Sequence, residues 1–286
     1  MPFVSVLWIA LSAAGAAAAA QEPARPSLDG SRRWVCFYGD HLSSQAWETL
    51  DLAIVDPDNF SLPTGSGPIR LAYVSAGEAD ERRAYWSSVS SKPFLVEPNP
   101  DWPGAHRVDM RDPEWRGLLV KTVAPAALGR GYQGVMLDTL DVAEYLESSA
   151  PARFAGSLDA AAALVRELRA AAPSAIILVN NALPLLDKIS DDIDGVVVED
   201  VYSRCLPAEP CRPTPPAETR AKEEILRRFA RRTGKPVFVL LYAHLGERGA
   251  RWVQKAARRS KASGFLPYLA DPSLERLGVP DPGGGR

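Results

Sequence analysis

The fold is decided by Val135-Met136-Leu137-Asp138-Thr139-Leu140-Asp141 and by Val196-Val197-Val198-Glu199-Asp200, two short stretches of the 286-residue chain. In each of them, an apolar run typical of a fully buried parallel strand stops at a carboxylate. Barrels and open α/β sheets carry their chemistry at the carboxyl ends of such strands. An Asp and a Glu delivered to one rim are the minimum equipment for cleaving a glycosidic bond. The alternative is that either acid only caps the helix that follows.

Eight strand-like runs recur along the chain and alternate with helical stretches. This alternation predicts an α/β protein with a parallel sheet. Eight strands without hairpin dipeptides between them favour closure into a single-domain (β/α)₈ TIM-type barrel. A short extended piece at Phe94–Val96 is expected to belong to a loop excursion after the third strand. The expected strands are Trp34–Tyr38, Leu52–Val55, Ile69–Val74, Gly134–Leu137, Ile176–Val179, Gly195–Val198, Pro236–Tyr242 and Gly264–Tyr268, and the expected helices are Pro113–Leu128, Leu158–Ala172, Glu218–Thr233 and Ala250–Ser263.

The two ends of the chain differ in composition from the part between them. Residues 1–20 are mostly apolar, and Ala18-Ala19-Ala20 offer a small-residue cleavage site, which predicts a secretory signal peptide and a secreted or periplasmic protein. A retained N-terminal anchor is the alternative. Residues 21–31 form a polar leader, residues 32–275 the barrel, and residues 276–286 a flexible tail rich in Gly and Pro. Cys205 and Cys211 bracket a proline-rich loop and are close enough in sequence to form a disulfide.

Charge and motifs exclude several classes of function. The net charge of −2 gives no electrostatic signature for binding nucleic acid, and no membrane association is expected after signal removal. The GxSxG, GxGxxG and GxxxxGK[ST] motifs are absent from the sequence, so no cofactor is expected. The three histidines form no HExxH or HxH pair, so no metal is expected, although carboxylates alone could suit Mg²⁺ or Ca²⁺. A monomer is expected.

Acidic residues gather at the predicted strand ends, whereas Arg and Lys crowd the last two predicted helices. An acidic mouth concentrates a cationic ligand, although basic helix faces can simply be solvated surfaces. Aromatic side chains at several strand ends suit the apolar faces of sugar rings, although each tyrosine could also pack at the rim with its hydroxyl in water. The candidate residues are the acids Asp56, Glu78, Asp138, Asp141 and Glu199, the tyrosines Tyr38, Tyr73, Tyr202, Tyr242 and Tyr268, and Asn180.

Several blocks of the sequence resemble glycoside hydrolase family 114, the endo-α-1,4-polygalactosaminidases and their relatives. The resemblance spans roughly residues 34–269, and the Ser-x-Gly-Glu and Leu-Asp-x-x-Asp blocks together are fairly specific. Where the family commonly has Asn-Gly after the fifth strand, this chain has Asn180-Asn181, and the loop 202–216 does not map onto the family. The matching blocks are Leu71–Glu78 with Arg83-Ala84-Tyr85-Trp86, Gly131–Asp141, Asn180-Asn181, Asp194–Glu199 and Gly264–Tyr268.

The resemblance implies a secreted (β/α)₈ hydrolase that acts on galactosamine-containing exopolysaccharide of biofilms. The catalytic Asp of the family falls on Asp138 and the catalytic Glu on Glu199, and Ser75 of the Ser-x-Gly-Glu block joins the residues expected to bind substrate. The expected partner is therefore a cationic amino-sugar polysaccharide. This agrees with the acidic mouth inferred from the strand ends.

The mechanism expected from these residues uses the two carboxylates. We favour Asp138 as the nucleophile and Glu199 as the acid/base, while retention and inversion both stay open. Asp56, Glu78 and Asp141 are assigned to substrate hydroxyl and ammonium groups. Two alternatives are a barrel that binds polysaccharide without cutting it, and a hydrolase for another sugar or amino-sugar polymer.

Overall fold

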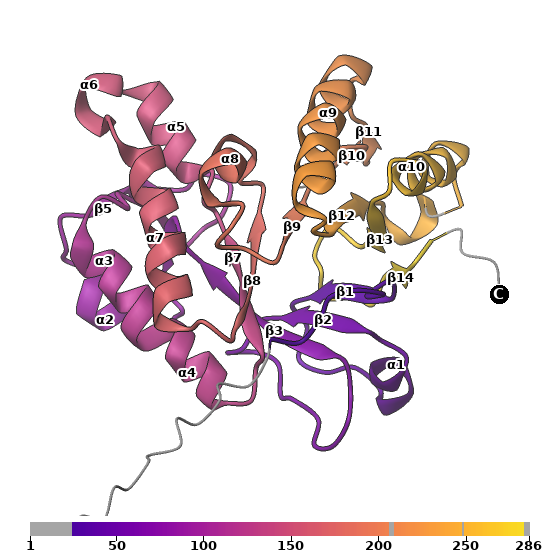
Figure 1. Cartoon of the computed structure of the whole chain (residues 1–286), viewed down its shortest axis with the longest axis horizontal. Helices are drawn as coiled ribbons and strands as arrows, with labels where there is room; N and C mark the ends of the chain where they lie inside the picture. The colour runs from indigo at the N-terminus through magenta and orange to yellow at the C-terminus, as the bar shows by residue number, and fades with distance from the viewer. Residues whose placement is uncertain (1–24, 206–208, 248, 283–286) are drawn as a thin grey trace, which may run out of the picture.

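A computed structural model describes residues 25–205, 209–247 and 249–282. The expected signal peptide, residues 1–20, lies outside the described residues. The eight expected strands are all present and form one parallel sheet that curves into a nearly closed barrel (Figure 1). Both the TIM-type barrel and the single domain are therefore confirmed. The barrel strands are β1 (Trp34–Phe37), β2 (Leu52–Val55), β3 (Ile69–Ser75), β7 (Gly134–Asp138), β8 (Ile176–Asn180), β9 (Gly195–Val198), β12 (Val237–Tyr242) and β13 (Leu266–Ala270).

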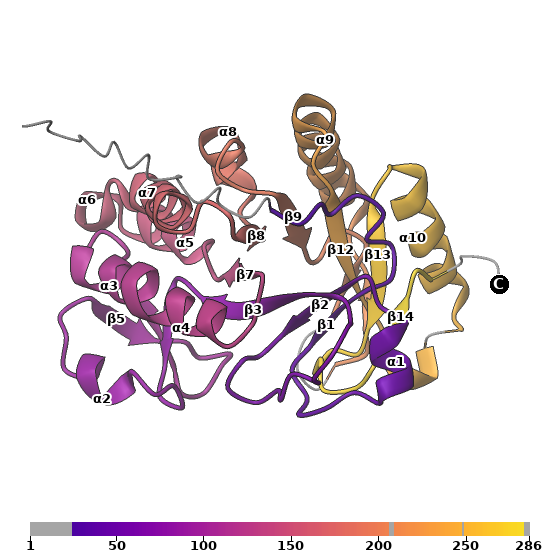
Figure 2. The same cartoon turned by 60° about the horizontal axis from the view of Figure 1, so that its bottom comes forward.

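Helices cover the outside of the barrel. In the turned view of Figure 2, α4, α5 and α7 lie on one side of the strands, and α9 and α10 lie on the other. The expected helices are confirmed to within two residues at each end, and α9 ends where Gly234 takes the left-handed conformation that glycine allows (φ 71°). The helices are α1 (Ser44–Glu48), α2 (Trp86–Val89), α3 (Pro113–Leu118), α4 (Ala124–Gly129), α5 (Val142–Ser149), α6 (Pro151–Phe154), α7 (Ser157–Ala171), α8 (Leu186–Ile189), α9 (Pro216–Thr233) and α10 (Arg251–Ala262), with 3₁₀ turns at Leu183–Leu185 and Leu245–Glu247.

The helix expected at 113–128 contains one irregular turn. A π-helical segment, Leu119–Val123, lies between α3 and α4. Pro125 occupies the first turn of α4 and has no N–H to donate to the preceding turn. The wider π turn absorbs this missing hydrogen bond and lets the helix continue.

Residues inserted after β3 form a second, small sheet. Strands β4 (Glu78–Asp80), β5 (Leu95–Pro98) and β6 (Ala105–Val108) pair antiparallel in the order β4-β6-β5. This sheet contains the extended piece expected at 94–96, so that segment does belong to an excursion after the third strand. The indole of Trp115 in α3 donates to the carbonyl of Ala76 at 2.7 Å and anchors the start of the insertion.

The seam between the first and last barrel strands is filled by side chains and by the end of the chain. The Trp34 indole donates to Leu266 O at 3.0 Å, and its ring contacts the Tyr268 ring at 5.5 Å. Strand β14 (Val279–Pro280) pairs antiparallel with β13. Part of the segment expected to be a flexible tail is therefore hydrogen-bonded to the sheet, because the exposed edge of β13 offers it unpaired backbone groups.

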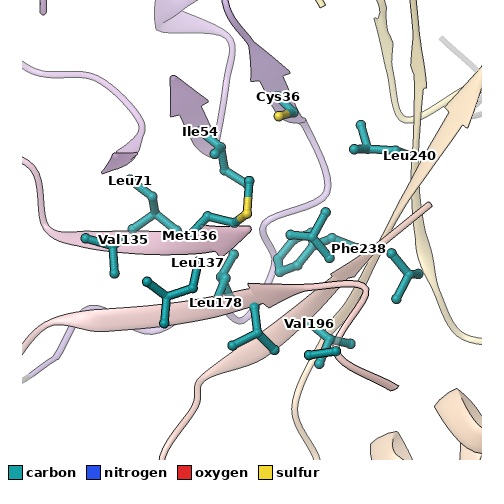
Figure 3. Packing of buried hydrophobic residues seen from close by; sticks show 14 of the residues in the cluster. Cys36, Ile54, Leu71, Val135, Met136, Leu137, Leu178, Val196, Phe238 and Leu240 are labelled. Carbon is teal, nitrogen blue, oxygen red and sulfur yellow. The ribbon is translucent and has the colours of Figure 1, made fainter. Parts of the chain in front are cut away.

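The core occupies the barrel interior and the layer between the strands and the helices. Figure 3 shows side chains from the barrel strands packed together, among them Cys36, Met136 and Phe238. Cys36 is fully buried, as expected of a small apolar residue in a strand. The apolar interior holds the strands in register, so residues that end the strands are fixed in position.

Candidate active site

The strand register brings the candidate residues to one end of the barrel. Ser75 lies opposite Asp138, Asn180 opposite Val197, and Val197 opposite Phe238. Side chains alternate along a strand, so residues in register on neighbouring parallel strands share a face. Glu199 follows Val197 by two residues. It therefore shares the inward-facing side with Asp138 and Asn180.

Asn180 joins the two carboxylates directly. Its Nδ2 atom donates to Asp138 Oδ1 at 2.8 Å and to Glu199 Oε1 at 2.5 Å. These two oxygens can lie no farther apart than the two bonds laid end to end, about 5.3 Å. Carboxyl groups about 5–5.5 Å apart are typical of retaining glycosidases, whereas inverting enzymes need about 6.5–9.5 Å.

Glu199 is held by three neighbours. Its Oε2 accepts a hydrogen bond from the Tyr242 hydroxyl at 3.0 Å, and its backbone N–H donates to Asn181 Oδ1 at 2.9 Å. Burial raises the pKa of Glu199 to about 7, and the neighbouring Asp138 charge adds to this rise. A carboxyl group with such a pKa keeps its proton near neutral pH, as a general acid must.

Asp138 is surrounded by donors. In addition to the Asn180 amide, its Oδ1 accepts the backbone N–H of Thr139 at 2.8 Å, and the Tyr73 hydroxyl contacts it as well. Together these donors fix the direction of the Asp138 carboxyl group. The same Asp138 charge, together with burial, raises the pKa of Tyr73, so this hydroxyl stays protonated and can donate.

Each site-bearing strand β7, β8 and β9 is followed closely by a residue with positive φ: Thr139 (60°), Asn181 (48°) and Asp200 (56°). L-residues rarely adopt this conformation, and it costs about 1–2 kcal/mol. It turns the chain sharply outward directly after the site residue. At Thr139 the turn is held because its Oγ1 accepts the Gly77 N–H at 2.8 Å and donates to the Asp138 carbonyl at 2.7 Å.

Asn181 resolves the departure from the family pattern at Asn180-Asn181. Asn tolerates positive φ better than most residues, so Asn181 can take a left-handed turn at the position where the family commonly has Gly. In addition, its side chain accepts the Glu199 N–H, which a glycine could not do.

This geometry predicts the order of stability among two variants at position 181. We expect Asn181→Ala to be about 1 kcal/mol less stable than Asn181→Gly, because a positive φ raises the free energy of an Ala residue but not that of Gly. Urea unfolding of both variants and of the wild type measures the difference. An Ala variant as stable as the Gly variant would contradict a left-handed turn at this position.

Two further candidate acids lie beside the pair. Asp141 is exposed as a whole residue, but its carboxyl group is surrounded by protein atoms. This burial, and then the Asp138 charge, raise the pKa of Asp141 to about 6. Glu78 is buried and accepts a hydrogen bond from Asn99 Nδ2 at 2.6 Å, and burial raises its pKa. Ser75 donates to the Glu78 carbonyl at 2.9 Å and contacts Thr139 Oγ1, so it braces the rim.

Three candidates are not brought to the Asp138–Glu199 pair. Asp56 is bound by Arg83, whose two terminal nitrogens lie 2.6 and 3.0 Å from its oxygens. The Tyr202 hydroxyl donates to Glu223 of α9 at 2.8 Å, outside the barrel. Tyr268 is in register with Leu240, two residues before Tyr242 on the neighbouring strand, so it lies deeper in the barrel than Tyr242. The Tyr268 hydroxyl accepts the Gly278 N–H at 2.7 Å.

The other two tyrosines line the barrel end beside Tyr242. The rings of Tyr38 and Tyr73 meet edge to face, with centroids 4.9 Å apart. Burial raises the pKa of Tyr38, whose hydroxyl contacts the Cys36 thiol. Tyr38 and Tyr73 are each partly exposed and could contact a ligand at this end.

Sequence reasoning gave no role at this site to Asn99 or Thr139, and it did not pair Arg83 with Asp56. Asn99 comes from the inserted sheet, and only the fold shows that it reaches Glu78. For Arg83, the Arg-x-Tyr-Trp block was visible, but its pairing with Asp56 depends on a contact between distant loops.

Cys205 and Cys211 form a disulfide that closes the short β10–β11 hairpin (Ser203–Arg204 and Arg212–Pro213). Among the described residues, Cys211, His244 and Glu247 place possible metal-ligand atoms within 4.8 Å of one another. The disulfide occupies the Cys211 sulfur, so this group does not fit a metal as it stands.

A TIM-type barrel that holds an Asp and a Glu within reach of one sugar linkage defines a glycoside hydrolase. The sequence model of glycoside-hydrolase family GH114 matches residues 13–283, and the chain belongs to that family. The resemblance inferred from the sequence blocks is thereby confirmed.

One relative and two solved structures are similar to this chain over most of its length, and the structures share its fold. An uncharacterized protein of Deinococcus radiodurans is 27% identical over 275 residues, covering 88% of this chain and 84% of the relative. The glycoside hydrolase domain of PelA from Pseudomonas aeruginosa has a TM-score of 0.75 at 22% identity, covering 86% of this chain and 97% of that one. Ega3 of Aspergillus fumigatus, solved in complex with galactosamine, has a TM-score of 0.69 at 16% identity, with coverages of 89% and 96%.

Proposed function

We propose that this enzyme cleaves α-1,4-linked galactosamine polymers with retention of anomeric configuration. The observation that carries the proposal is the single Asn180 amide that binds both Asp138 and Glu199. It holds the nearest oxygens of the two carboxyl groups within about 5.3 Å of each other, in line with the short carboxyl separation of retaining glycosidases, in which one carboxylate attacks the sugar directly.

The charge of the site supports a cationic substrate. Among the described residues, Glu78, Asp138, Asp141 and Glu199 take part in no salt bridge with Lys, Arg or His. A polymer that carries ammonium groups would supply the missing positive charge. The galactosamine complex of Ega3, which shares this fold, is in line with an amino sugar at the site.

In the first step, a carboxylate oxygen of Asp138 attacks the anomeric carbon while the proton of Glu199 passes to the glycosidic oxygen. The carbon–oxygen bond to the leaving sugar breaks, and a covalent glycosyl–Asp138 ester forms. The donors around Asp138 hold its carboxyl group in position for this attack, whereas the raised pKa of Glu199 keeps its proton available.

In the second step, Glu199 takes a proton from a water molecule that attacks the same carbon from the opposite side. The ester bond breaks, Asp138 leaves as a carboxylate, and Glu199 is protonated again. Two inversions at one carbon give net retention.

Asn180 contributes a second polar group to substrate binding. Its Oδ1 atom is buried and has no hydrogen-bond partner among the described residues. A buried acceptor without a partner costs free energy, and a substrate hydroxyl or ammonium group would remove that cost. Asn180 would then orient the two carboxyl groups through Nδ2 and the sugar through Oδ1.

We further propose that the protein is exported and acts on exopolysaccharide, including that of biofilms. The apolar stretch at residues 1–20 and the Cys205–Cys211 disulfide both suit an oxidising compartment outside the cytoplasm. Within the part of the chain that the structure describes, no helix has the length and apolar character needed to cross a membrane.

The deciding experiment compares three soluble polymers. Purified enzyme is incubated with galactosamine, N-acetylgalactosamine and glucosamine polymers, and new reducing ends and their anomeric form are followed by NMR. We expect the fastest release from the galactosamine polymer, with the α anomer formed first. Binding to that polymer without any new reducing ends would support a non-catalytic barrel, and faster release from another polymer would overturn the substrate assignment.

A further inference from the structure

The most exposed large apolar side chain among the described residues lies in the inserted sheet. Trp102, in the turn between β5 and β6, exposes 63% of its surface, whereas the other three such side chains expose 37–43%. Exposing an aromatic ring of this size to water forfeits the hydrophobic gain of burying it. The exposed indole is available to stack on the apolar face of a sugar ring.

The turn that carries Trp102 is held in place by hydrogen bonds. Trp102 N donates to Asn99 O at 3.3 Å, Ala105 N donates to Trp102 O at 3.0 Å, and Asn99 N donates to Ala105 O at 2.8 Å. The Asn99 side chain also accepts the N–H of Asp101. The ring is thus held on an ordered turn, so little conformational entropy is lost when a ligand binds to it.

The same turn is tied to the catalytic end of the barrel. Asn99 Nδ2 donates to Glu78 Oε1 at 2.6 Å, and the Asp138 charge acts on that carboxyl group. Strand β4 runs from Glu78 toward Glu81, whose N–H donates to Gly104 in the Trp102 turn. At about 3.3 Å per residue, the Gly104 end of the turn lies about 10 Å along the strand from Glu78, a distance that a bound sugar chain can cover.

The charge around Trp102 is negative, because the nearby arginines are already paired with carboxylates and two acidic side chains are not paired with any described Lys or Arg. Arg82 is bound to Asp80 at 2.6 Å, and Arg107 is bound to Glu97 at 2.7 Å. Asp101 takes part in no salt bridge among the described residues. Within the described ranges, the half-exposed Glu81 forms a salt-bridge contact with His106 alone. The two side chains attract each other as charges only when the histidine is protonated.

We propose that Trp102 and the acidic residues beside it form an accessory binding site for a cationic amino-sugar chain. One face of a sugar ring stacks on the indole, and the ammonium group of the same or the next sugar lies near Asp101 and Glu81. This inference rests on the proposed function, because it takes the polymer cleaved at Asp138 to extend over the inserted sheet. The site retains long chains and contributes less to short ones.

The test uses the full-length chain and separates binding from cleavage. Trp102→Ala, Trp102→Phe and a control, Leu277→Ala, are each made in the active enzyme and in an Asp138→Asn background. Leu277 is also exposed and apolar, but it precedes β14 by two residues, and β14 and β5 lie on opposite sides of the barrel (Figure 1). Dissociation constants for a long galactosamine polymer are measured in the inactive background, and kcat and KM are measured for the polymer and for a trimer in the active one.

We expect Trp102→Ala to weaken polymer binding about tenfold, equal to about 1.4 kcal/mol. The polymer KM should rise by the same factor at unchanged kcat. Trp102→Phe should restore most of the affinity, and Leu277→Ala should match the parent enzyme. Asp101→Asn with Glu81→Gln should weaken binding of the deacetylated polymer more than that of the fully N-acetylated one.

Two results would overturn the accessory site. One is a Trp102→Ala variant that binds polymer like its parent, and the other is an equal loss on trimer and polymer together with a lower melting temperature, which marks a structural role. Failure of the proposed function looks different: the wild type would then release no sugars, while binding to the Asp138→Asn protein would still report on Trp102.

Discussion

Asp138→Asn is expected to lower the rate of galactosamine-polymer hydrolysis by roughly 10⁴-fold or more, the scale of loss when a covalent nucleophile is removed. The amide oxygen can still accept the Thr139 N–H, so the local fold should persist. The change also removes a negative charge beside the buried Glu199, so the melting temperature should stay level or rise. Reducing-end release and thermal unfolding by circular dichroism measure both effects.

Asp200→Asn is the matched control for this variant. Asp200 follows Glu199 directly and has positive φ, which Asn tolerates as well as Asp does. Its charge interacts with Lys222 and Arg204, and it has no part in the proposed chemistry. Asp138→Asn with more than a tenth of wild-type activity, or an Asp200→Asn enzyme that is equally inactive, would contradict the nucleophile assignment.

The second large effect is expected for Glu199→Gln. Loss of the general acid should slow polymer hydrolysis about 10²–10⁴-fold. A substrate with an activated phenolate leaving group needs little protonation, so its first step should be affected far less. Burst kinetics with a nitrophenyl α-galactosaminide would reveal the glycosyl-enzyme, which then accumulates because no base activates water.

The pH profile gives an independent test of the same residue. The acid must be protonated, and burial with the Asp138 charge raises the pKa of Glu199 to about 7. Wild-type kcat/KM should therefore fall as pH rises through about 7. In Glu199→Gln the residual activity should show no such alkaline limb, and a limb that persisted there would assign it to another group.

The barrel was predictable because its strands are buried on both faces. A run such as Val196–Val198 has no polar position, and only a central parallel strand suits it. The acids that end β7 and β9 were predictable for the same reason, since the first polar residue after such a run lies at the rim. The inserted sheet was visible only as the short piece at 94–96, because its three strands are short and partly exposed.

The side chains around the catalytic pair were predicted less well, because strand-end position alone does not fix direction. Tyr202 comes after the left-handed turn at Asp200, which takes the chain outward, so its hydroxyl meets α9. Tyr268 lies level with Leu240, two residues deeper in the barrel than Tyr242, and so does not reach the carboxyl groups. Asp56 was counted as a free acid, yet Arg83 from another loop neutralises it. These outcomes depend on contacts between residues far apart in sequence.

The left-handed residues that follow β7, β8 and β9 bear on any effort to make this enzyme withstand heat. Three unfavourable backbone conformations at one end of the barrel mean that free energy of folding is given up there to aim the reacting groups. Replacing these residues to relax the backbone would trade turnover for thermal endurance. Engineering should instead start at the outer helices, where exposed positions on α9 and α10 can change without moving the carboxyl groups.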